Sequence, residues 1–335
     1  MNQRASGCVF GLAYGDALGG PVEFAQFGRI VERYGVGGPR ELEGDPARVT
    51  DDTQMALAVA DALLAAGGQP DGWRPAPVVE ALRNTFAAWW ASPENTRAPG
   101  MTCLHACEGL AGGKTWREAT GRGSKGCGAN MRVAPVGLVP GLDDDLRAAL
   151  AQMQAAMTHG HPTALAASEL TAFAVHWLRG GMPPTALMGA LQERCREQRE
   201  VWREEWLADL WMGPGVRTAE EYIARGWDEC ADALETVADA LRRGPDREAD
   251  PCLATGDGWV AEEALATGLY CFLMFPEEPV SAVARAAGSS GDSDSIACLT
   301  GAFAGAAYGM EAWPAEWAER IEYAEELRRI GRAWD

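Results

Sequence analysis

The segment GSSGDSDSIACLTGAFAGAAYG, residues 288–309, decides the fold of this chain. It places Asp292 and Asp294 among glycine and serine residues, and the stretch that follows, from Ile296 to Met310, has no charged side chain. That stretch is shorter than the roughly 20 residues that a membrane-spanning helix needs. We therefore expect a buried helix whose start carries two acidic side chains.

Two glycine stripes with a period of four residues accompany this segment, one near each end of the chain. The first consists of Gly7, Gly11, Gly15 and Gly19, and the second of Gly301, Gly305 and Gly309. On a helix, this period places the glycines on one face, where a neighbouring backbone can approach closely. Because glycine costs about 1 kcal/mol relative to alanine inside a helix, close packing must offset the loss. The two stripes are expected to face each other or one shared central helix.

The rest of the chain also predicts helices. Alternating β-branched and aromatic runs are nearly absent, whereas Ala, Leu, Glu and Arg dominate long windows. Residues 54–66 and 163–178 each have one apolar helical face, and the charged, tryptophan-containing region 193–250 is typical of outer helices. Glycine and proline interrupt the pattern without a long linker. The prediction is an all-α fold in a single domain, residues 1–335.

Composition and charge exclude several classes of function. Of the 335 residues, 47% are hydrophobic and 23% are charged, as in soluble globular proteins. A formal net charge of −19 argues against broad binding to nucleic acid or to anionic membranes. Nine cysteines without a CxxC pair are expected to be buried thiols of a reducing compartment. With no signal-peptide pattern, we expect a cytoplasmic protein; the sequence makes no prediction of oligomeric state.

A second acidic cluster stands at the start of another apolar helix. In VTDDTQMALAVADALL, residues Thr50, Asp51 and Asp52 precede the apolar positions, much as Asp292 and Asp294 do in the first segment. Each cluster by itself can be explained as an N-terminal cap, because an acidic side chain there accepts backbone N–H groups and interacts favourably with the helix dipole. Together, however, the four carboxylates exceed what two caps require.

The oxygen donors of the two clusters suit hard divalent cations, because Mg²⁺ and Mn²⁺ select all-oxygen ligand sets. The candidate ligands are Thr50, Asp51, Asp52, Asp292, Asp294 and Ser295. If the two helix starts meet in space, their charges repel strongly unless a metal neutralises them. Four carboxylates can hold two ions about 3.5–4 Å apart. The residues therefore predict a metal pocket for two Mg²⁺ or Mn²⁺ ions.

Three further features carry weaker signals. The loop 121–128 contains four glycines and is either a flexible connection or a cradle for phosphate. His159 stands before a helix and is a candidate for contact with substrate or with a metal ligand. Glu23 follows a Gly-Gly-Pro break that carries it off the first helix, and a single glutamate in a loop is usually solvated.

Taken together, these motifs resemble the ADP-ribosylglycohydrolase family, which includes the dinitrogenase reductase-activating glycohydrolase. The motifs are GLAYGDALGGPVEF, TDDT, a glycine-rich loop ending in MRVAP, THGHPTA and GDSDS, in the family's order over about residues 7–310. The resemblance implies a compact orthogonal helical bundle with a central cleft for two Mg²⁺ or Mn²⁺ ions. It also implies hydrolysis of the bond that joins ADP-ribose to an acceptor, often a protein side chain.

The resemblance also assigns roles to individual residues. It implies that Glu23, Asp52 and Asp292 are catalytic, with Glu23 polarising water or a ribose hydroxyl. The residues that would contact the diphosphate and ribose are Ser124, Gly126, Cys127, Gly128, Asn130 and His159. Several relatives have Gly-Asn-Gly in the loop, whereas this chain has Cys127 in place of the asparagine and adds a charge at Lys125. This departure bears on acceptor specificity.

The functional prediction is a metal-dependent hydrolase that removes ADP-ribose from a modified macromolecule, with arginine in a protein as the favoured acceptor. Its expected partners are ADP-ribosylated protein or ADP-ribose itself. Two alternatives stay open: a module that binds ADP-ribose without cleaving it, and a structural, crystallin-like member of the same fold. The intact set of four aspartates favours catalysis.

Overall fold

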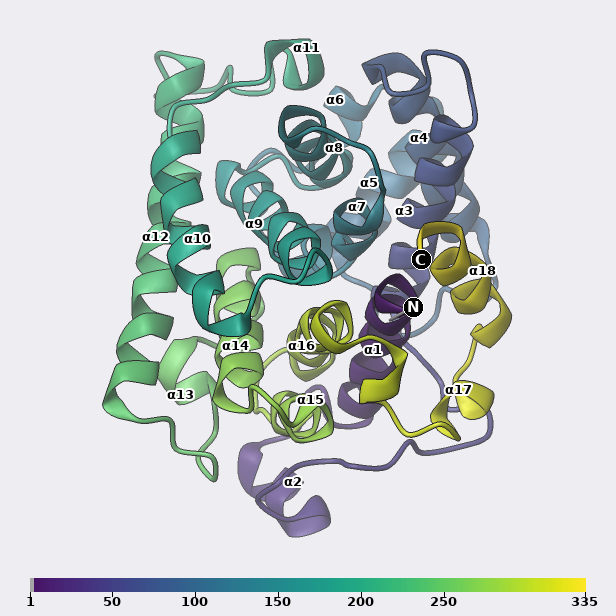
Figure 1. Cartoon of the computed structure of the whole chain (residues 1–335). Coiled ribbons are helices and arrows are strands. Elements are labelled where there is room, and N and C mark those ends of the chain that lie inside the picture. Colours follow the sequence, from purple (N-terminus) through teal and green to yellow (C-terminus); the bar gives the residue numbers. More distant parts are fainter. Residues whose placement is uncertain (1–2) are drawn as a thin grey trace.

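Helices α1 (Arg4–Gly19) and α16 (Ser293–Tyr308) lie side by side at the centre of the molecule (Figure 1). The structure is a computed structural model and describes residues 3–335. All residues of α16 from Ser293 to Ala307 are buried. The uncharged segment is therefore a buried helix, as its sequence predicts.

Eighteen α-helices and three short 3₁₀ helices make up the regular structure, and residues 3–335 contain no β-strand, only isolated bridges. The all-α prediction is confirmed. Besides α1 and α16, the helices are α2 (Phe27–Tyr34), α3 (Asp51–Gly67), α4 (Pro75–Ala91), α5 (Met101–Ala111), α6 (Trp116–Ala119), α7 (Ala134–Leu138), α8 (Asp144–Ala156), α9 (Pro162–Arg179), α10 (Pro184–Gln198), α11 (Glu204–Leu207), α12 (Ala219–Arg243), α13 (Cys252–Thr255), α14 (Ala261–Met274), α15 (Pro279–Ala287), α17 (Trp317–Arg320) and α18 (Ala324–Trp334), with η1 (Gly20–Val22), η2 (Cys127–Ala129) and η3 (Met310–Ala312).

The two glycine stripes face each other and let the backbones of α1 and α16 touch. A Cβ atom added at Gly11 would lie 2.3 Å from the carbonyl oxygen of Gly301, and one added at Gly305 would lie 1.9 Å from that of Gly7. Real Cβ atoms do not approach other atoms this closely. The close packing that the stripes predict is confirmed, and it requires glycine at these positions.

The remaining helices surround this central pair. In Figure 1, α9, α14 and α15 cover α16, α3 and α18 flank α1, and α10 and α12 lie on the outside, as the charged region 193–250 predicts. One hydrophobic cluster includes residues from α1 through α18. One continuous cluster agrees with the expected single domain over residues 1–335, and the domain assignment stays a prediction. All nine cysteines are buried and free.

The last residue of the chain holds the start of α1. Oδ1 of Asp335 accepts hydrogen bonds from the N–H groups of Ala5 and Ser6 at 2.8 and 3.1 Å, and Oδ2 accepts one from the Ser6 hydroxyl at 2.5 Å. The carboxylate thus acts as an N-terminal cap supplied from the far end of the sequence. Within residues 3–335, no helix has both the length and the apolar character that a bilayer crossing requires.

The substitution Gly11→Ala is expected to lower the free energy of unfolding by about 2–3 kcal/mol or more. The added methyl group meets backbone atoms, which no change of side-chain rotamer can move. Denaturant unfolding measures the effect. The control is Gly189→Ala on the exposed face of α10, where a Cβ meets nothing within 4 Å and helix propensity should raise stability by about 0.5–1 kcal/mol. Equal stability of Gly11→Ala and the unchanged protein would contradict the packing argument.

Candidate active site

A cleft of about 280 Å³ opens where the first turns of α3 and α16 meet the loop 121–128. Both acidic clusters line it, although they are far apart in the sequence. Of the residues singled out in the sequence, the lining contains Glu23, Asp51, Asp52, Gly126, Cys127, Gly128, His159, Asp292, Asp294 and Ser295. The functional roles given to these residues stay predictions, but the structure brings them together around one cavity.

Asp16, which is buried in α1, holds the first turn of α3 in place. Its two carboxylate oxygens accept hydrogen bonds from the Thr50 N–H at 2.9 and 3.0 Å. Oδ2 also accepts from the Thr53 N–H at 3.0 Å and from the Thr53 hydroxyl at 2.5 Å. The cap of α3 is the Thr50 hydroxyl, which accepts from the Asp52 N–H at 3.3 Å. Asp51 and Asp52 are therefore not needed as the cap, and both face the cleft.

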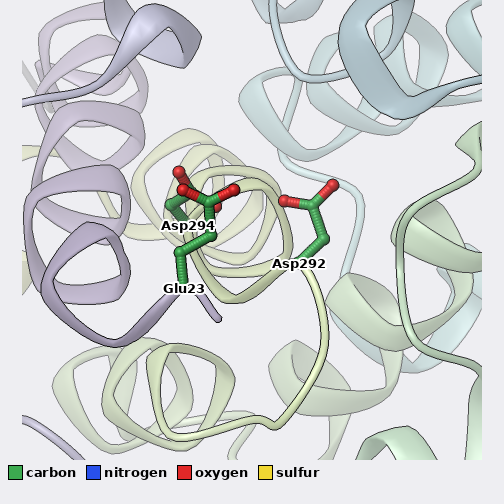
Figure 2. A group of neighbouring side chains, drawn as sticks. All are labelled: Glu23, Asp292 and Asp294. Carbon is green, nitrogen blue, oxygen red and sulfur yellow. The ribbon is translucent and has the colours of Figure 1, made fainter. Parts of the chain in front are cut away.

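The first turn of α16 is fixed by backbone contacts. The Asp292 N–H donates to the carbonyl oxygen of Asp257 at 2.7 Å, while its side chain makes no capping hydrogen bond. A Cβ added at Gly19 would lie 2.5 Å from Cα of Asp294, so the end of α1 touches the backbone of this turn. Figure 2 shows Glu23, Asp292 and Asp294 side by side, and one carboxylate oxygen of each lies within 4.8 Å of the other two.

The carboxylates of the cleft are held in an environment that opposes their ionisation. Burial, reinforced by repulsion from Asp294, raises the pKa of Glu23 to about 8 and the pKa of Asp51 to about 8. The same two causes raise the pKa of Asp52 and of Asp292 well above the usual range. Within the described part of the chain, no lysine or arginine forms a salt bridge with these groups. A cation from solution would relieve this repulsion.

The available donor atoms fit a hard divalent cation. Oδ2 of Asp52 is buried and accepts no hydrogen bond from residues 3–335, so it is an oxygen that still needs a partner. Two thiols also line the cleft, but burial raises the pKa of Cys127 well above its usual value and that of Cys103 to about 11. Burial therefore disfavours the thiolate form of both sulfurs, which is the form that binds metal. The oxygen-rich set matches Mg²⁺ or Mn²⁺ better than zinc.

The glycine loop forms another part of the cleft wall and differs in part from the predicted cradle. The N–H groups of Gly121, Ser124 and Cys127 donate to protein carbonyl oxygens at 2.8, 2.9 and 3.1 Å, so they do not point at an anion. Of the loop's four glycines, Gly126 and Gly128 line the cleft. A Cβ atom at either glycine would meet the imidazole of His159, which also lines the cleft, and at Gly128 it would meet Sγ of Cys103 as well.

Lys125 does not bring an unpaired charge to the cleft, contrary to what its sequence position indicates. Its Nζ lies 2.7 Å from a carboxylate oxygen of Glu229 on α12 and also pairs with Glu262 on α14. Lys125 does not line the cavity. The lysine therefore fastens the glycine loop to two neighbouring helices, and its charge is neutralised there.

Three predicted site residues lie behind the lining of the cleft. The Thr50 hydroxyl caps α3, and the Ser124 hydroxyl lies 3.0 Å from that of Thr102. Asn130 is completely buried, and its amide donates to the carbonyl oxygen of Ala261 at 3.2 Å. Asn130 thus joins the loop to α14 and does not line the cleft, and its contact with a ligand stays a prediction.

Sequence reasoning missed two features of the site. Asp16 is the only charged residue between Arg4 and Glu23, and this isolation in an apolar helix was a usable signal. The second feature is a stacked aromatic pair at the cleft, Phe24 and Trp259, with ring centroids 5.8 Å apart and planes 12° apart. No local pattern links two aromatic residues so distant in the sequence.

A family model described as ADP-ribosylglycohydrolase matches residues 1–334. The chain belongs to the ADP-ribosylglycohydrolase family. It is 28% identical to the ADP-ribosyl-[dinitrogen reductase] glycohydrolase of Rhodospirillum rubrum, over all of this chain and 95% of that protein. It is 26% identical to the ADP-ribosylhydrolase ARH3 of Bos taurus over 96% of this chain and 90% of the relative. As a member of this family, the chain is an enzyme, a hydrolase that acts on glycosyl bonds.

A solved structure supports the same assignment. The chain is similar to an ADP-ribosylglycohydrolase-related protein complex with a TM-score of 0.70 and 26% sequence identity, over 99% of this chain and 96% of the other. The predicted fold type is therefore confirmed. The family's motifs coincide with the walls of the cleft, because the GDALGGPVEF, TDDT and GDSDS segments contribute Glu23, Asp51, Asp52, Asp292 and Asp294 to the lining.

In this ADP-ribosylglycohydrolase, Asp16→Asn is expected to lower the free energy of unfolding by about 2–4 kcal/mol. In the asparagine variant, an NH₂ group replaces one of the two carboxylate oxygens. Buried N–H groups of Thr50 and Thr53 that now donate to this oxygen would lose their acceptor. Thermal or denaturant unfolding measures the change. Asp61→Asn, on the exposed side of α3 in an ion pair with Arg329, is the control and should stay within about 0.5 kcal/mol of the unchanged protein. Equal losses in both variants would refute the role of Asp16.

Proposed function

We propose that this protein is a Mg²⁺- or Mn²⁺-dependent hydrolase that releases ADP-ribose from ADP-ribosylated arginine in a protein. The observation that carries the proposal is the meeting of both acidic clusters and Glu23 around one cleft that residues of the glycine loop also line. The relative from Pseudomonas putida named ADP-ribosylarginine hydrolase Tri1, 25% identical over 98% of this chain, supports the choice of arginine.

Oxygen ligands for two ions would come from both helix starts. Asp51 and Asp52 would contribute from α3, and Asp292, Asp294 and Ser295 from α16. Thr50 lies beside them. Burial raises the pKa of Asp294, and a hydrogen bond with the Thr50 hydroxyl opposes part of that rise. When bound, such ions supply the positive charge that activates water and orients the ribose hydroxyls.

The chain's own side chains would perform the remaining chemistry. Cleavage of a glycosidic bond passes through a cationic sugar, which nearby carboxylates stabilise. Glu23 is half-buried at the cleft and stands where it could polarise water or a ribose hydroxyl, with Asp52 and Asp292 as the other catalytic candidates. Gly126 and Gly128 leave room for the diphosphate because neither has a side chain. His159 would contact the ligand beside this loop.

The aromatic pair favours a flat, cationic acceptor. Phe24 directly follows Glu23, so the pair stands next to the acidic cluster where the scissile bond would lie, and 71% of Phe24 and 41% of Trp259 is exposed. A guanidinium group can stack on such rings through cation–π attraction, which a serine hydroxyl cannot do. In ADP-ribose, the diphosphate separates adenine from the ribose whose bond is cleaved. Adenine would therefore bind elsewhere along the cleft.

Release of ADP-ribose tests the proposed function directly. The protein is incubated with arginine-, serine- and nucleic-acid-linked ADP-ribose, with Mg²⁺, with Mn²⁺ or with chelator, and free ADP-ribose is quantified. We expect release from the arginine-linked substrate only when metal is present. Saturable binding of ADP-ribose without release from any substrate would instead favour the non-catalytic binding module, and absence of both would favour a structural role.

Asp292→Ala is expected to lower kcat/KM by about a thousandfold or more and to weaken metal binding, because one carboxylate of the cluster is lost. Turnover assays and calorimetric titration with Mn²⁺ measure the two effects, and circular dichroism should still show a helical protein. The control is Asp239→Ala on the outer helix α12, which should keep normal turnover. Unchanged turnover of Asp292→Ala with metal present would overturn the mechanism.

Trp259→Ala is expected to raise KM for the arginine-linked substrate about tenfold, in line with the loss of one partly desolvated cation–π contact. Affinity for free ADP-ribose should change less than about twofold, and Trp259→Phe should restore most of the loss. A matching loss of affinity for free ADP-ribose would mean that the pair contacts the nucleotide and not the acceptor.

A further inference from the structure

Arg132 is a completely buried cation that follows the glycine loop and has no acidic partner. Its Nε and Nη2 donate to Oε1 and the carbonyl oxygen of Gln154, both at 2.8 Å, and the guanidinium lies over the ring of Phe86 at 4.5 Å. Its Nη1 faces the sulfur atoms of Met55 and Cys103. Across residues 3–335, no carboxylate is in salt-bridge contact with it. Such a group is costly to bury, so its placement calls for a reason.

One further hydrogen bond of Arg132 leads toward the cleft. Its Nη2 donates to the Thr158 hydroxyl at 2.8 Å, and that hydroxyl lies 2.8 Å from Nδ1 of His159. A guanidinium only donates, so one lone pair of the hydroxyl oxygen is occupied by Arg132. The hydroxyl proton of this buried threonine is satisfied if it points at Nδ1. His159 Nδ1 is then the acceptor, and the single proton of the neutral ring must sit on Nε2.

The ring of His159 is kept neutral by its surroundings. It is only 2% exposed, and burial, together with the positive charge of Arg132, lowers the pKa of His159 to about 3. Neutrality leaves two tautomers, and the hydroxyl of Thr158 selects between them. The choice matters because an imidazole nitrogen with a proton attracts an oxygen ligand, whereas one without a proton repels it.

The Nε2 edge of the ring lies beside two glycines of the loop that line the cleft. A Cβ added at Gly126 would lie 3.3 Å from Nε2 of His159, and one added at Gly128 would lie 3.5 Å from it. His159 and both glycines line the same cleft. Because both positions are glycine, no side chain of Gly126 or Gly128 stands beside Nε2, and a ligand in the cleft can come close to the ring.

We propose that Arg132, acting through the Thr158 hydroxyl, fixes His159 as the Nε2–H tautomer so that the ring donates a hydrogen bond to an oxygen of the diphosphate. Arg132 and Thr158 are positioning residues, because neither touches the ligand. The proposal rests on the proposed function only in taking ADP-ribose as the occupant of the cleft. The tautomer itself is a property of the ligand-free protein and can be tested separately.

Nitrogen NMR of the ligand-free protein tests the tautomer. The chain has only four histidines, and His159→Gln identifies the signals of His159 by their disappearance. We expect an unprotonated, pyridine-type Nδ1 and a protonated, pyrrole-type Nε2. Thr158→Ser keeps the hydroxyl and should leave this pattern unchanged, whereas Thr158→Val should give a mixture of tautomers. A proton on Nδ1 in the unchanged protein would overturn the proposal, whatever the enzymatic activity.

Binding of ADP-ribose, measured by calorimetry with Mg²⁺ present, tests the consequence. Thr158→Val is expected to weaken binding about tenfold, the typical effect of losing a hydrogen bond to a charged oxygen, and Thr158→Ser should stay within about twofold. The decisive comparison uses His159→Gln, whose amide can donate from the Nε2 position without depending on Thr158. In that background, Thr158→Val should cause less than about a twofold further loss. Equal losses in both backgrounds would show a merely structural role for Thr158 and refute the relay.

Arg132 itself is tested by Arg132→Met, which keeps the bulk of the side chain and removes its donors. We expect the same mixture of tautomers as in Thr158→Val, with helical content unchanged by circular dichroism. If this variant fails to fold, the Thr158 pair still decides the proposal, because those substitutions leave the guanidinium in place. A folded Arg132→Met protein with an unchanged Nε2–H tautomer would exclude Arg132 from the relay.

Discussion

Backbone contact between α1 and α16 fixes the position of the helices that carry the acidic clusters. Because the facing positions of both helices are glycine, carbonyl oxygens of one helix lie against Cα atoms of the other. This contact fixes the ends of the two helices relative to each other. The Gly19 end of α1 touches the turn that carries Asp294, and Asp16 on the same helix binds the first turn of α3. One rigid contact therefore sets the positions of both acidic clusters. Each glycine lowers the intrinsic stability of its helix, but the close packing that it allows positions the walls of the cleft.

The interior around the cleft separates charge in an unusual way. On one side, carboxylates crowd together without a basic partner; on the other, Arg132 is buried without an acidic one. Direct pairing of these charges would cancel the attraction that each side can offer to a ligand. Kept apart, the carboxylates suit cations, and Arg132 can orient a neutral histidine beside the glycine loop. Metal and diphosphate sites would thus adjoin within one cavity.

The glycine loop departs from the family pattern at Lys125 and Cys127, but neither residue adds a charge to the cleft. Lys125 places a charge beside the expected diphosphate site, but Glu229 and Glu262 hold its ammonium group away from the cleft. Cys127 is buried as a neutral thiol, since burial raises its pKa well above the usual value. The wall of the cleft therefore stays uncharged at both positions.

Elements with a local signal could be predicted from the amino-acid sequence. The uncharged helix after Asp294, the glycine stripes and the acidic starts of α3 and α16 are periodicities and short motifs, and they predicted the helical fold and the acidic part of the cleft lining. Which groups meet depends on the tertiary structure: the hydrogen bonds of Asp16 to α3, the ion pairs of Lys125, the stacking of Phe24 on Trp259 and the hydrogen bond of Asn130 to Ala261. The physical reason is that each of these contacts joins segments far apart in the chain, and hydrogen-bond direction and burial exist only once those segments are packed.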